Sequence, residues 1–364
     1  MKTTKLHLLI LATVLALTAP TRAFTFRQLS SGTKVKWPAD TVVMRVYTGS
    51  FPPVGQRRVA LEEAVLRWND NPSKFQFSLE YGDLSSGRQN EIWFTDADGL
   101  LDGRSGVTFC WRHHGDLVEA DIILADWDDY WTTSHDPSLN FAYGGPRMPM
   151  QTAMLHELGH ALGLLHEDDE YNVMGTDWNH VNAHADATHY YAGEDACDGA
   201  VSLYGLDSSH REDVSVTHWR YRDSDGEYSV HYRTRVYKTD GTEAEVVTGS
   251  VRDDRTYYVT MGHHVRVQFT YENSGASDQS PLVKYYLSTD DAWDTGDRLL
   301  GSNSPSLSRN SVFTPGASDC MEILIPTDLV AGRTYYILAV MDPDHAITEV
   351  NESNNVSYIR VQIK

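Results

Sequence analysis

The chain has 364 residues, of which 51 are acidic and 30 are basic, and its formal net charge is −21. Such a negative surface repels nucleic acid and anionic lipid, so we expect neither as a partner. It favours divalent cations, which makes Ca²⁺ a candidate structural cofactor bound by carboxylates at 126–129 or 290–297. Neither segment has EF-hand spacing, and a solvated acidic loop is an equal alternative for each.

The first 23 residues have the features of a signal peptide. Lys2 and Lys5 precede an apolar run at 8–17, and small residues then lead to a plausible cleavage site after Ala23. The run is too short to span a membrane and no other long apolar stretch follows, so we expect a secreted, soluble protein without a membrane span. Fewer than 20 residues separate Ala23 from the first predicted strand, which leaves no room for a folded inhibitory propeptide.

Residues 24–206 mix strand-like and helix-like segments. Residues 41–47 predict a strand, and a helix is predicted after the two prolines at 52–53 from the spacing of Leu61, Ala64, Val65 and Trp68. Further strands are predicted at 75–79, 91–94 and 118–125.

The segment 156–166 carries the strongest functional signal. His156 and His160 are four residues apart, so on a helix they share a face and lie roughly 6 Å from each other. Glu157 lies beside the first histidine, where it can reach a metal-bound water. Gly163 can adopt the left-handed conformation that ends a helix, which would turn the chain and bring His166 back to the metal. Zn²⁺ suits three such ligands, because it keeps a position open for water and lowers that water's pKa. The alternative is an ordinary helix with core and surface histidines.

The pattern H-E-x-x-H-x-x-G-x-x-H resembles the signature of the metzincin zinc peptidases. Met174 is the candidate for their methionine turn, with ordinary core packing as its alternative, and its distance from His166 is most similar to the matrixin branch. Residues 195–205 resemble the last helix of a matrixin domain.

The resemblance implies an α+β catalytic domain at 24–206, with a twisted mixed sheet plus helices. It also implies a mechanism in which Glu157 is the general base, taking a proton from the zinc-bound water and passing it to the leaving amine. In matrixins an edge strand pairs with the extended substrate, and 118–125 occupies the corresponding place in this sequence. We therefore predict that this strand binds substrate through Ala120, Ile122 and Leu124.

Other motifs in this region carry weaker signals. Thr176 stands where some metzincin branches have a tyrosine ligand, so none is expected there. Residues 111–116 are tempting as a second zinc site, but a solvated loop is favoured on ligand number. Loop histidines are favoured at His180, His184 and His189. Of the three cysteines, Cys110, Cys197 and Cys320, the first two form the natural disulfide pair for an oxidising compartment, although a free Cys110 acting as an inhibitory zinc ligand is an alternative.

Residues 207–213 predict a polar linker, and 214–364 predict an antiparallel β-sandwich. Examples of its predicted strands are 228–238, 265–271, 334–340 and 356–363. This region resembles the bacterial cell-adhesion-related sandwich domains of immunoglobulin-like topology. The resemblance rests on the turn at 273–275, on 285–290, on 332–336 and on Asp342 with 349–355. A module of this kind implies a cell-surface or matrix ligand.

The sequence thus predicts a secreted zinc endopeptidase that acts on protein or peptide substrates. The first alternative is an adhesion or surface-binding protein whose protease domain is degenerate, although all three predicted ligands and the base are present. The second is a zinc amidase that uses the same chemistry on a non-peptide amide.

Overall fold

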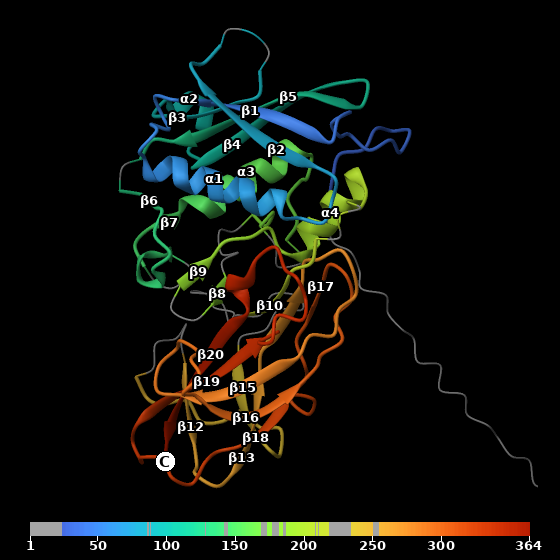
Figure 1. Cartoon of the computed structure of the whole chain (residues 1–364). Helices are drawn as coiled ribbons and strands as arrows, with labels where there is room; N and C mark the ends of the chain where they lie inside the picture. Colours follow the sequence, from blue (N-terminus) through green and yellow to red (C-terminus); the bar gives the residue numbers. More distant parts are fainter. Residues whose placement is uncertain are drawn as a thin grey trace, which may run out of the picture.

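The computed structural model of this chain has two lobes, one above the other in Figure 1. It describes residues 24–85, 87, 89–127, 129–141, 145–168, 173–176, 182–184, 187–207, 209, 211–217, 234–249 and 255–364. The predicted signal peptide, 1–23, lies outside the described residues. Among the helices that are described, none is long and apolar enough to cross a membrane.

The upper lobe is a mixed α/β region built on a five-stranded sheet with the order β2-β1-β3-β5-β4. Strands β2, β1, β3 and β5 are parallel neighbours, and β4 runs antiparallel to β5. The strands are β1 (Thr41–Tyr47), β2 (Gln76–Gly82), β3 (Glu91–Thr95), β4 (Gly106–His113) and β5 (Asp116–Ala125).

Two long helices, α1 (Gln56–Asn69) and α3 (Met150–Leu162), lie side by side along the sheet (Figure 1). Trp68 on α1 is fully buried, and its Nε1 donates to the Leu155 carbonyl of α3 at 2.8 Å. This bond fixes the spacing of the two helices within one hydrophobic core. The remaining elements of the lobe are α2 (Asp98–Leu101), β6 (Trp131–Thr132), η1 (Pro137–Leu139), β7 (Met148–Pro149), β8 (Asn182–His184), β9 (Ala187–His189) and α4 (Glu194–Tyr204).

The position of β5 corrects the predicted substrate strand. β5 pairs with β3 on one side and with β4 on the other, so it is an interior strand. Its inward side chains are 0–1 % exposed, because they fill the core between the sheet and α3: Ala120, Ile122 and Leu124. The prediction that 118–125 forms the edge of the cleft is therefore wrong. The edge strand beside α3 is β4.

The lower lobe is a β-sandwich with its own hydrophobic core. It contains a five-stranded sheet, β12-β20-β19-β15-β16, and the three-stranded sheets β10-β14-β17 and β11-β13-β18. The pairing is antiparallel except between β12 and β20, which are parallel, so the sandwich is not purely antiparallel as predicted. Of the strand predicted at 228–238, residues 228–233 lie outside the described residues.

The described strands of this lobe, with one short 3₁₀ helix, have the following bounds: β10 (Val214–Thr217), β11 (Arg235–Lys238), β12 (Thr256–Val259), β13 (His264–Gln268), β14 (Thr270–Asn273), β15 (Val283–Ser288), β16 (Arg298–Asn303), β17 (Ser311–Phe313), β18 (Met321–Leu324), β19 (Thr334–Met341), η3 (Glu352–Asn354) and β20 (Val356–Ile363).

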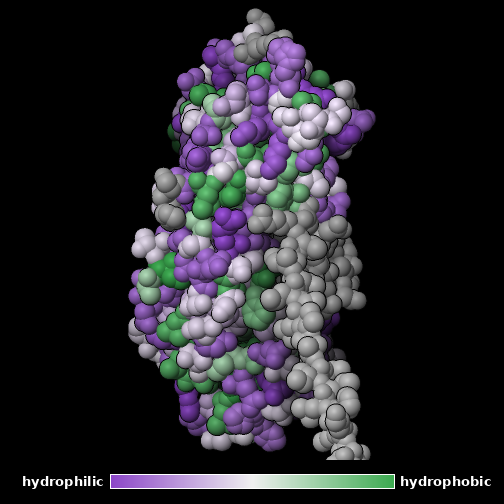
Figure 2. Space-filling view, turned by 90° about the vertical axis from the view of Figure 1, so that its right-hand side faces the viewer, coloured by the Kyte–Doolittle hydropathy of each residue, from purple (hydrophilic) through white to green (hydrophobic). Residues whose placement is uncertain are grey.

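Polar contacts join the two lobes. The Tyr191 hydroxyl donates to Glu272 Oε2 at 2.5 Å, and Arg211 donates to the Asn71 carbonyl at 3.2 Å. On the face shown in Figure 2, hydrophilic residues predominate and hydrophobic ones form small scattered groups.

Two partly buried acidic side chains lie where the chain enters the sandwich. Asp213 Oδ1 accepts a hydrogen bond from Asn354 at 2.9 Å, and Glu349 Oε1 accepts one from the Val214 amide at 2.7 Å. Burial raises the pKa of Asp213 to about 7 and that of Glu349 to about 8. These carboxyl groups are therefore costly to ionise in the folded chain.

The predicted disulfide between Cys110 and Cys197 is not formed, and Cys320 is also a free thiol. Cys110 lies on β4 with its Sγ 3.5 Å from the His160 carbonyl oxygen, whereas Cys197 is buried in α4. Burial raises the pKa of the Cys110 thiol to about 11, which disfavours the thiolate that a metal ligand requires.

Candidate metal centre

Helix α3 places two of the three predicted ligands on one face. Its apolar residues surround the axis almost completely, which accounts for its burial in the middle of the lobe. His156 and His160 are one turn apart, and both reach the cavity between α3 and β4. The helix ends at Gly163, whose φ of +121° matches the predicted turn. The Gly163 amide donates to the Gly159 and His160 carbonyls and closes the last turn.

The third histidine is held from outside the helix. After Gly163 the chain runs beside the first described residues: the Leu165 amide donates to the Thr25 carbonyl at 3.0 Å, and the Thr25 hydroxyl donates to the His166 carbonyl at 2.7 Å. The Phe24 amide in turn donates to Asp195 Oδ1 of α4 at 3.0 Å. The backbone of His166 is therefore fixed by a segment far away in the sequence.

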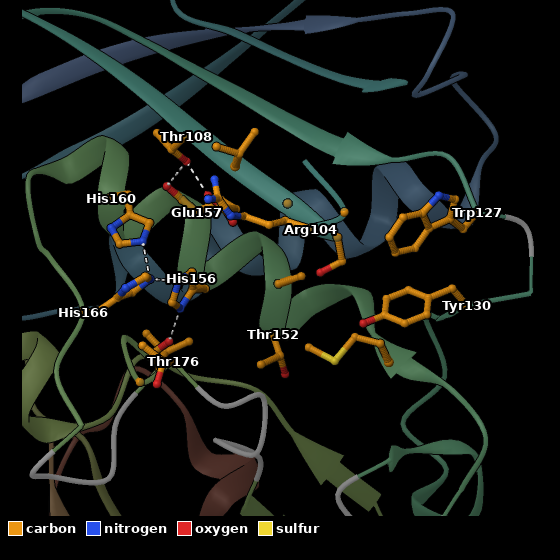
Figure 3. A pocket seen from close by; sticks show the side chains of 18 residues that line it. Arg104, Thr108, Trp127, Tyr130, Thr152, His156, Glu157, His160, His166 and Thr176 are labelled. Carbon is orange, nitrogen blue, oxygen red and sulfur yellow. Dashed lines mark hydrogen bonds between the residues drawn. The ribbon is translucent and has the colours of Figure 1, made fainter. Parts of the chain in front are cut away.

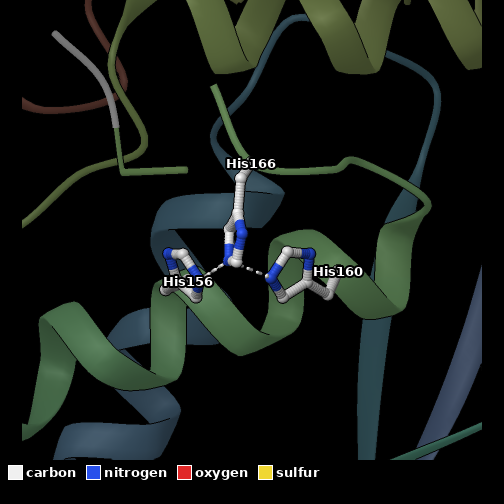
Figure 4. Close-up of side chains that lie close together, drawn as sticks. All are labelled: His156, His160 and His166. Carbon is white, nitrogen blue, oxygen red and sulfur yellow. Dashed lines mark hydrogen bonds between the residues drawn. The ribbon is translucent and has the colours of Figure 1, made fainter. Parts of the chain in front are cut away.

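The three imidazoles converge on one point (Figure 4). His166 Nε2 lies 3.2 Å from the Nε2 atoms of both His156 and His160. Nitrogen ligands about 2.0–2.1 Å from a tetrahedral zinc ion would lie roughly 3.4 Å from one another, so this spacing fits such an ion. Within the described part of the chain, this is the one group of three or more His, Cys, Asp or Glu ligands close enough to hold a metal ion.

Backbone carbonyls orient two of the rings. His156 Nδ1 lies 2.8 Å from the Val173 oxygen, and His160 Nδ1 lies 2.9 Å from the Leu164 oxygen. A ring that donates from Nδ1 keeps its Nε2 lone pair for a metal. Burial lowers the pKa of His160 to about 4, so its imidazole is neutral at physiological pH, as metal binding requires.

Glu157 lies one residue beyond the first histidine and faces β4 (Figure 3). It is 6 % exposed, and its Oε2 accepts a hydrogen bond from the Thr108 hydroxyl at 2.6 Å. Burial raises the pKa of Glu157 to about 7, although the Thr108 hydrogen bond and the charge of Arg104 oppose this shift. A carboxyl group with a pKa near neutrality can both accept and release a proton.

Met174, the residue predicted for the methionine turn, packs beneath α3. It is 2 % exposed, and it lies so close to the helix that a Cβ added to Gly159 would come within 2.2 Å of its Sδ. Its carbonyl accepts from the Glu167 amide at 3.0 Å, and the Val173 amide donates to Ala192 at 3.0 Å. The turn thus supports the same helical segment that carries the histidines.

A cavity of about 790 Å³ opens in front of the histidines and Glu157. It extends from His166 past the base to the aromatic side chains of Trp127 and Tyr130 (Figure 3). The walls are largely apolar, and the N-terminal end of β4 forms one side. A cavity of this size accommodates several side chains of a peptide.

The other predicted sites are not assembled as metal centres among the described residues. His113 and His114 are exposed and stack edge to face with each other, 4.0 Å between ring centroids. In the acidic segments, Asp126 Oδ1 pairs with Arg57 at 2.6 Å, and Asp294 Oδ1 accepts from the Gly296 amide of its own loop. The calcium assignment stays a prediction.

The prediction of loop histidines is wrong for two of the three residues, because His184 ends strand β8 and His189 ends strand β9. His180 and the side chain of His184 lie outside the described residues. The ring of His189 lies 6.1 Å from that of His135.

Two residues of the site were not found from the sequence. Gly106 and Thr108 lie on β4 and contact the Glu157 carboxylate from across the cavity edge. The contact joins residues 49 positions apart, so no local spacing reveals it. The available signal was the alternation of residues in 106–113, which places every second side chain on the face toward α3.

Comparisons with known proteins concern the sandwich. Residues 250–358 match the family model described as CARDB. No curated protein matches the chain. The upper lobe has a group of three histidines that could hold a metal ion, and the family model does not extend to this lobe.

Similar solved structures include the CARDB domain of a Pyrococcus furiosus protein, crystallised in complex with di-metal ions. It has 14 % identity and a TM-score of 0.26, and the match covers 42 % of this chain and 90 % of that one. A solution structure of the same domain has 18 % identity and a TM-score of 0.24, with 42 % and 95 % covered. A domain of a Methanosarcina acetivorans protein described as a cell-surface protein has 22 % identity and a TM-score of 0.21, with 27 % and 75 % covered.

Proposed function

We propose that this chain is a secreted zinc-dependent endopeptidase of metzincin type. The observation that carries the proposal is the convergence of three imidazole Nε2 atoms, 3.2 Å apart in two pairs, beside a buried carboxyl group at the wall of a large cavity. His156, His160 and His166 would hold the ion. Zinc bound there supplies Lewis acidity, which lowers the pKa of water and polarises a carbonyl group.

The chain's own residues account for the proton transfers. Glu157 accepts a proton from the attacking water and delivers it to the leaving amine nitrogen. Its pKa of about 7 suits both steps, since the two protonation states have similar free energies near neutral pH. Burial among β4 and α3 keeps bulk water from competing for this proton.

Substrate binding follows from the edge strand. Among the described strands β4 pairs with β5 alone, and its first residues line the cavity, so an extended peptide can pair with its outer edge. Backbone pairing of this kind accepts many sequences, which suits an endopeptidase acting on extracellular proteins. An adhesion protein with a degenerate protease domain would be expected to have lost a ligand or the base, and all four residues are present.

The test compares the wild-type chain with Glu157→Gln. We expect the wild type to cleave a peptide mixture with zinc and to stop on chelation. Glu157→Gln should keep one zinc ion per chain, measured by mass spectrometry, and should lose at least about 100-fold in kcat, because general bases contribute roughly 10²–10⁴-fold. Cleavage by Glu157→Gln at the wild-type rate would refute the role of the base. Wild type that binds zinc and leaves every peptide intact would refute the proposed activity.

The sandwich would tether this activity to a cell-surface or matrix ligand. The inactive Glu157→Gln chain is the suitable probe, because it cannot release itself by cleaving its target. Retention on intact cells or deposited extracellular matrix, measured by fluorescence, supports the tether. Absence of retention on both argues against it.

A further inference from the structure

Three alternating residues of β4 face helix α3, which carries His156, Glu157 and His160. Gly106 and Thr108 contact Glu157, and Cys110 contacts the His160 carbonyl. The edge strand therefore touches the segment that carries the base and a ligand. Only the Thr108 side chain on this face offers a hydroxyl to the carboxylate.

The Thr108 hydroxyl donates a hydrogen bond to one carboxylate oxygen of Glu157. Its Oγ1 lies 2.6 Å from Oε2 and 3.0 Å from the Glu157 backbone oxygen. A hydroxyl has one proton to donate, and an ionised carboxylate is the stronger acceptor, so the bond goes to Oε2. Oε2 is thereby fixed, and Oε1 is the oxygen available for a reacting water.

Gly106 provides the space for that second oxygen. A Cβ at this position would lie 2.7 Å from Oε1 and 3.2 Å from Cδ of Glu157. Its other near neighbour, at 3.1 Å, would be Cδ2 of the buried Leu124. The carboxylate could give way only by turning out of its position, because Oε2 is held by Thr108.

We propose that Thr108, with the space left by Gly106, is the positioning residue that fixes the Glu157 carboxylate for proton transfer. The proposal rests on the proposed peptidase function. Thr108 donates to Oε2 both before and after Oε1 takes the proton from water, since Oε2 is an acceptor in the carboxylate and in the carboxylic acid. The carboxyl group therefore keeps one orientation through the reaction, which is the condition for efficient transfer.

The kinetic test uses Thr108→Val, which keeps the shape and removes the hydroxyl, and Thr108→Ser, which keeps the hydroxyl. Thr217→Val is the matched control, because Thr217 is a buried threonine of the sandwich whose hydroxyl donates to a backbone carbonyl. We expect Thr108→Val to lower kcat at least about tenfold with KM changed less than about twofold, the size expected for a hydrogen bond to a charged group. The kcat of Thr108→Ser should stay within about threefold of the wild-type value, and the kcat of Thr217→Val should equal the wild-type value.

A double-mutant cycle supplies a readout that does not depend on activity. Unfolding is measured for the wild type, Thr108→Val, Glu157→Ala and the double variant, with zinc stoichiometry determined for each. The proposal requires non-additive effects on the unfolding midpoint, since the two side chains share a bond. Coupling without any peptide cleavage would mean that the proposed function fails while the contact stands. Two kinetic results would overturn the positioning role: full kcat in Thr108→Val, or a decrease of kcat in Thr108→Ser equal to that in Thr108→Val. Additive changes of the unfolding midpoint, or loss of zinc from Thr108→Val, would overturn it as well.

Discussion

The substitution Gly159→Ala tests the packing between helix α3 and Met174. The new Cβ would lie 2.2 Å from Met174 Sδ and 3.0 Å from Trp68 Cζ2. Neither neighbour has room to move aside, because the Trp68 ring donates a hydrogen bond to the Leu155 carbonyl and the Met174 side chain is only 2 % exposed. Forcing a methyl group into such a core costs up to about 3 kcal/mol, whereas alanine gains about 1 kcal/mol over glycine in a helix. The net effect is a loss of about 2 kcal/mol.

For a lobe of this size, that loss lowers the unfolding temperature by roughly 4–8 °C. Differential scanning calorimetry of the full chain, with and without zinc, measures it, and chelator competition measures the zinc affinity, which should fall because Met174 supports the histidine helix. The control is Gly99→Ala in α2, where a Cβ would meet no atom within 4 Å. A Gly159→Ala transition at or above the wild-type temperature, or an equal decrease in Gly99→Ala, would refute the packing argument.

Two further predictions concern the metal and the partly buried carboxyl groups of the sandwich. His166→Ala should weaken zinc binding by more than about 100-fold, because loss of groups that only hydrogen-bond a ligand already costs roughly 10- to 100-fold; titration with a zinc indicator checks this, with His113→Ala as the unaffected control. The sandwich should lose stability as pH rises from about 4 to 8, since the pKa values of Asp213 and Glu349 are raised in the folded state, which therefore binds more protons than the unfolded chain in this window. Asp213 accounts for a loss of at most about 4 kcal/mol in the free energy of unfolding. Thermal unfolding at pH 5 and pH 8 measures this loss. A sandwich that is more stable at pH 8, or a Glu349→Gln variant whose stability depends on pH as in the wild type, would contradict the role of these carboxyl groups.

Helix α3 and its two histidines could be predicted because the sequence signals for them are local. The spacing of His156 and His160 and the glycine at 163 determine a face and a turn within a few residues, and the structure has both. The edge strand could not be predicted in this way, because strand order depends on pairing between distant segments. One local signal was present: 122–125 is continuously apolar, as in strands buried on both faces, whereas the β4 segment ends in the polar residues Arg112 and His113.

The cysteine pairing failed for a related reason. Composition and compartment suggested that Cys110 and Cys197 would pair, but partners are decided by distance in the fold. One thiol lies on an edge strand and the other in the last helix of the lobe. The bond between Thr108 and Glu157 is equally long-range, and for that reason the positioning residue appeared only with the structure.

The way His166 is held has a consequence for the biogenesis of the protein. Its backbone is bonded to Thr25, 141 positions earlier, and the neighbouring Phe24 is bonded to Asp195, 171 positions later. During synthesis, the hydrogen bond between Phe24 and Asp195 cannot form until α4 has left the ribosome. A nascent chain would carry His156 and His160 without a fixed third ligand, and its metal affinity would be low. The order in which these parts are made would therefore delay the proposed activity until the upper lobe is complete.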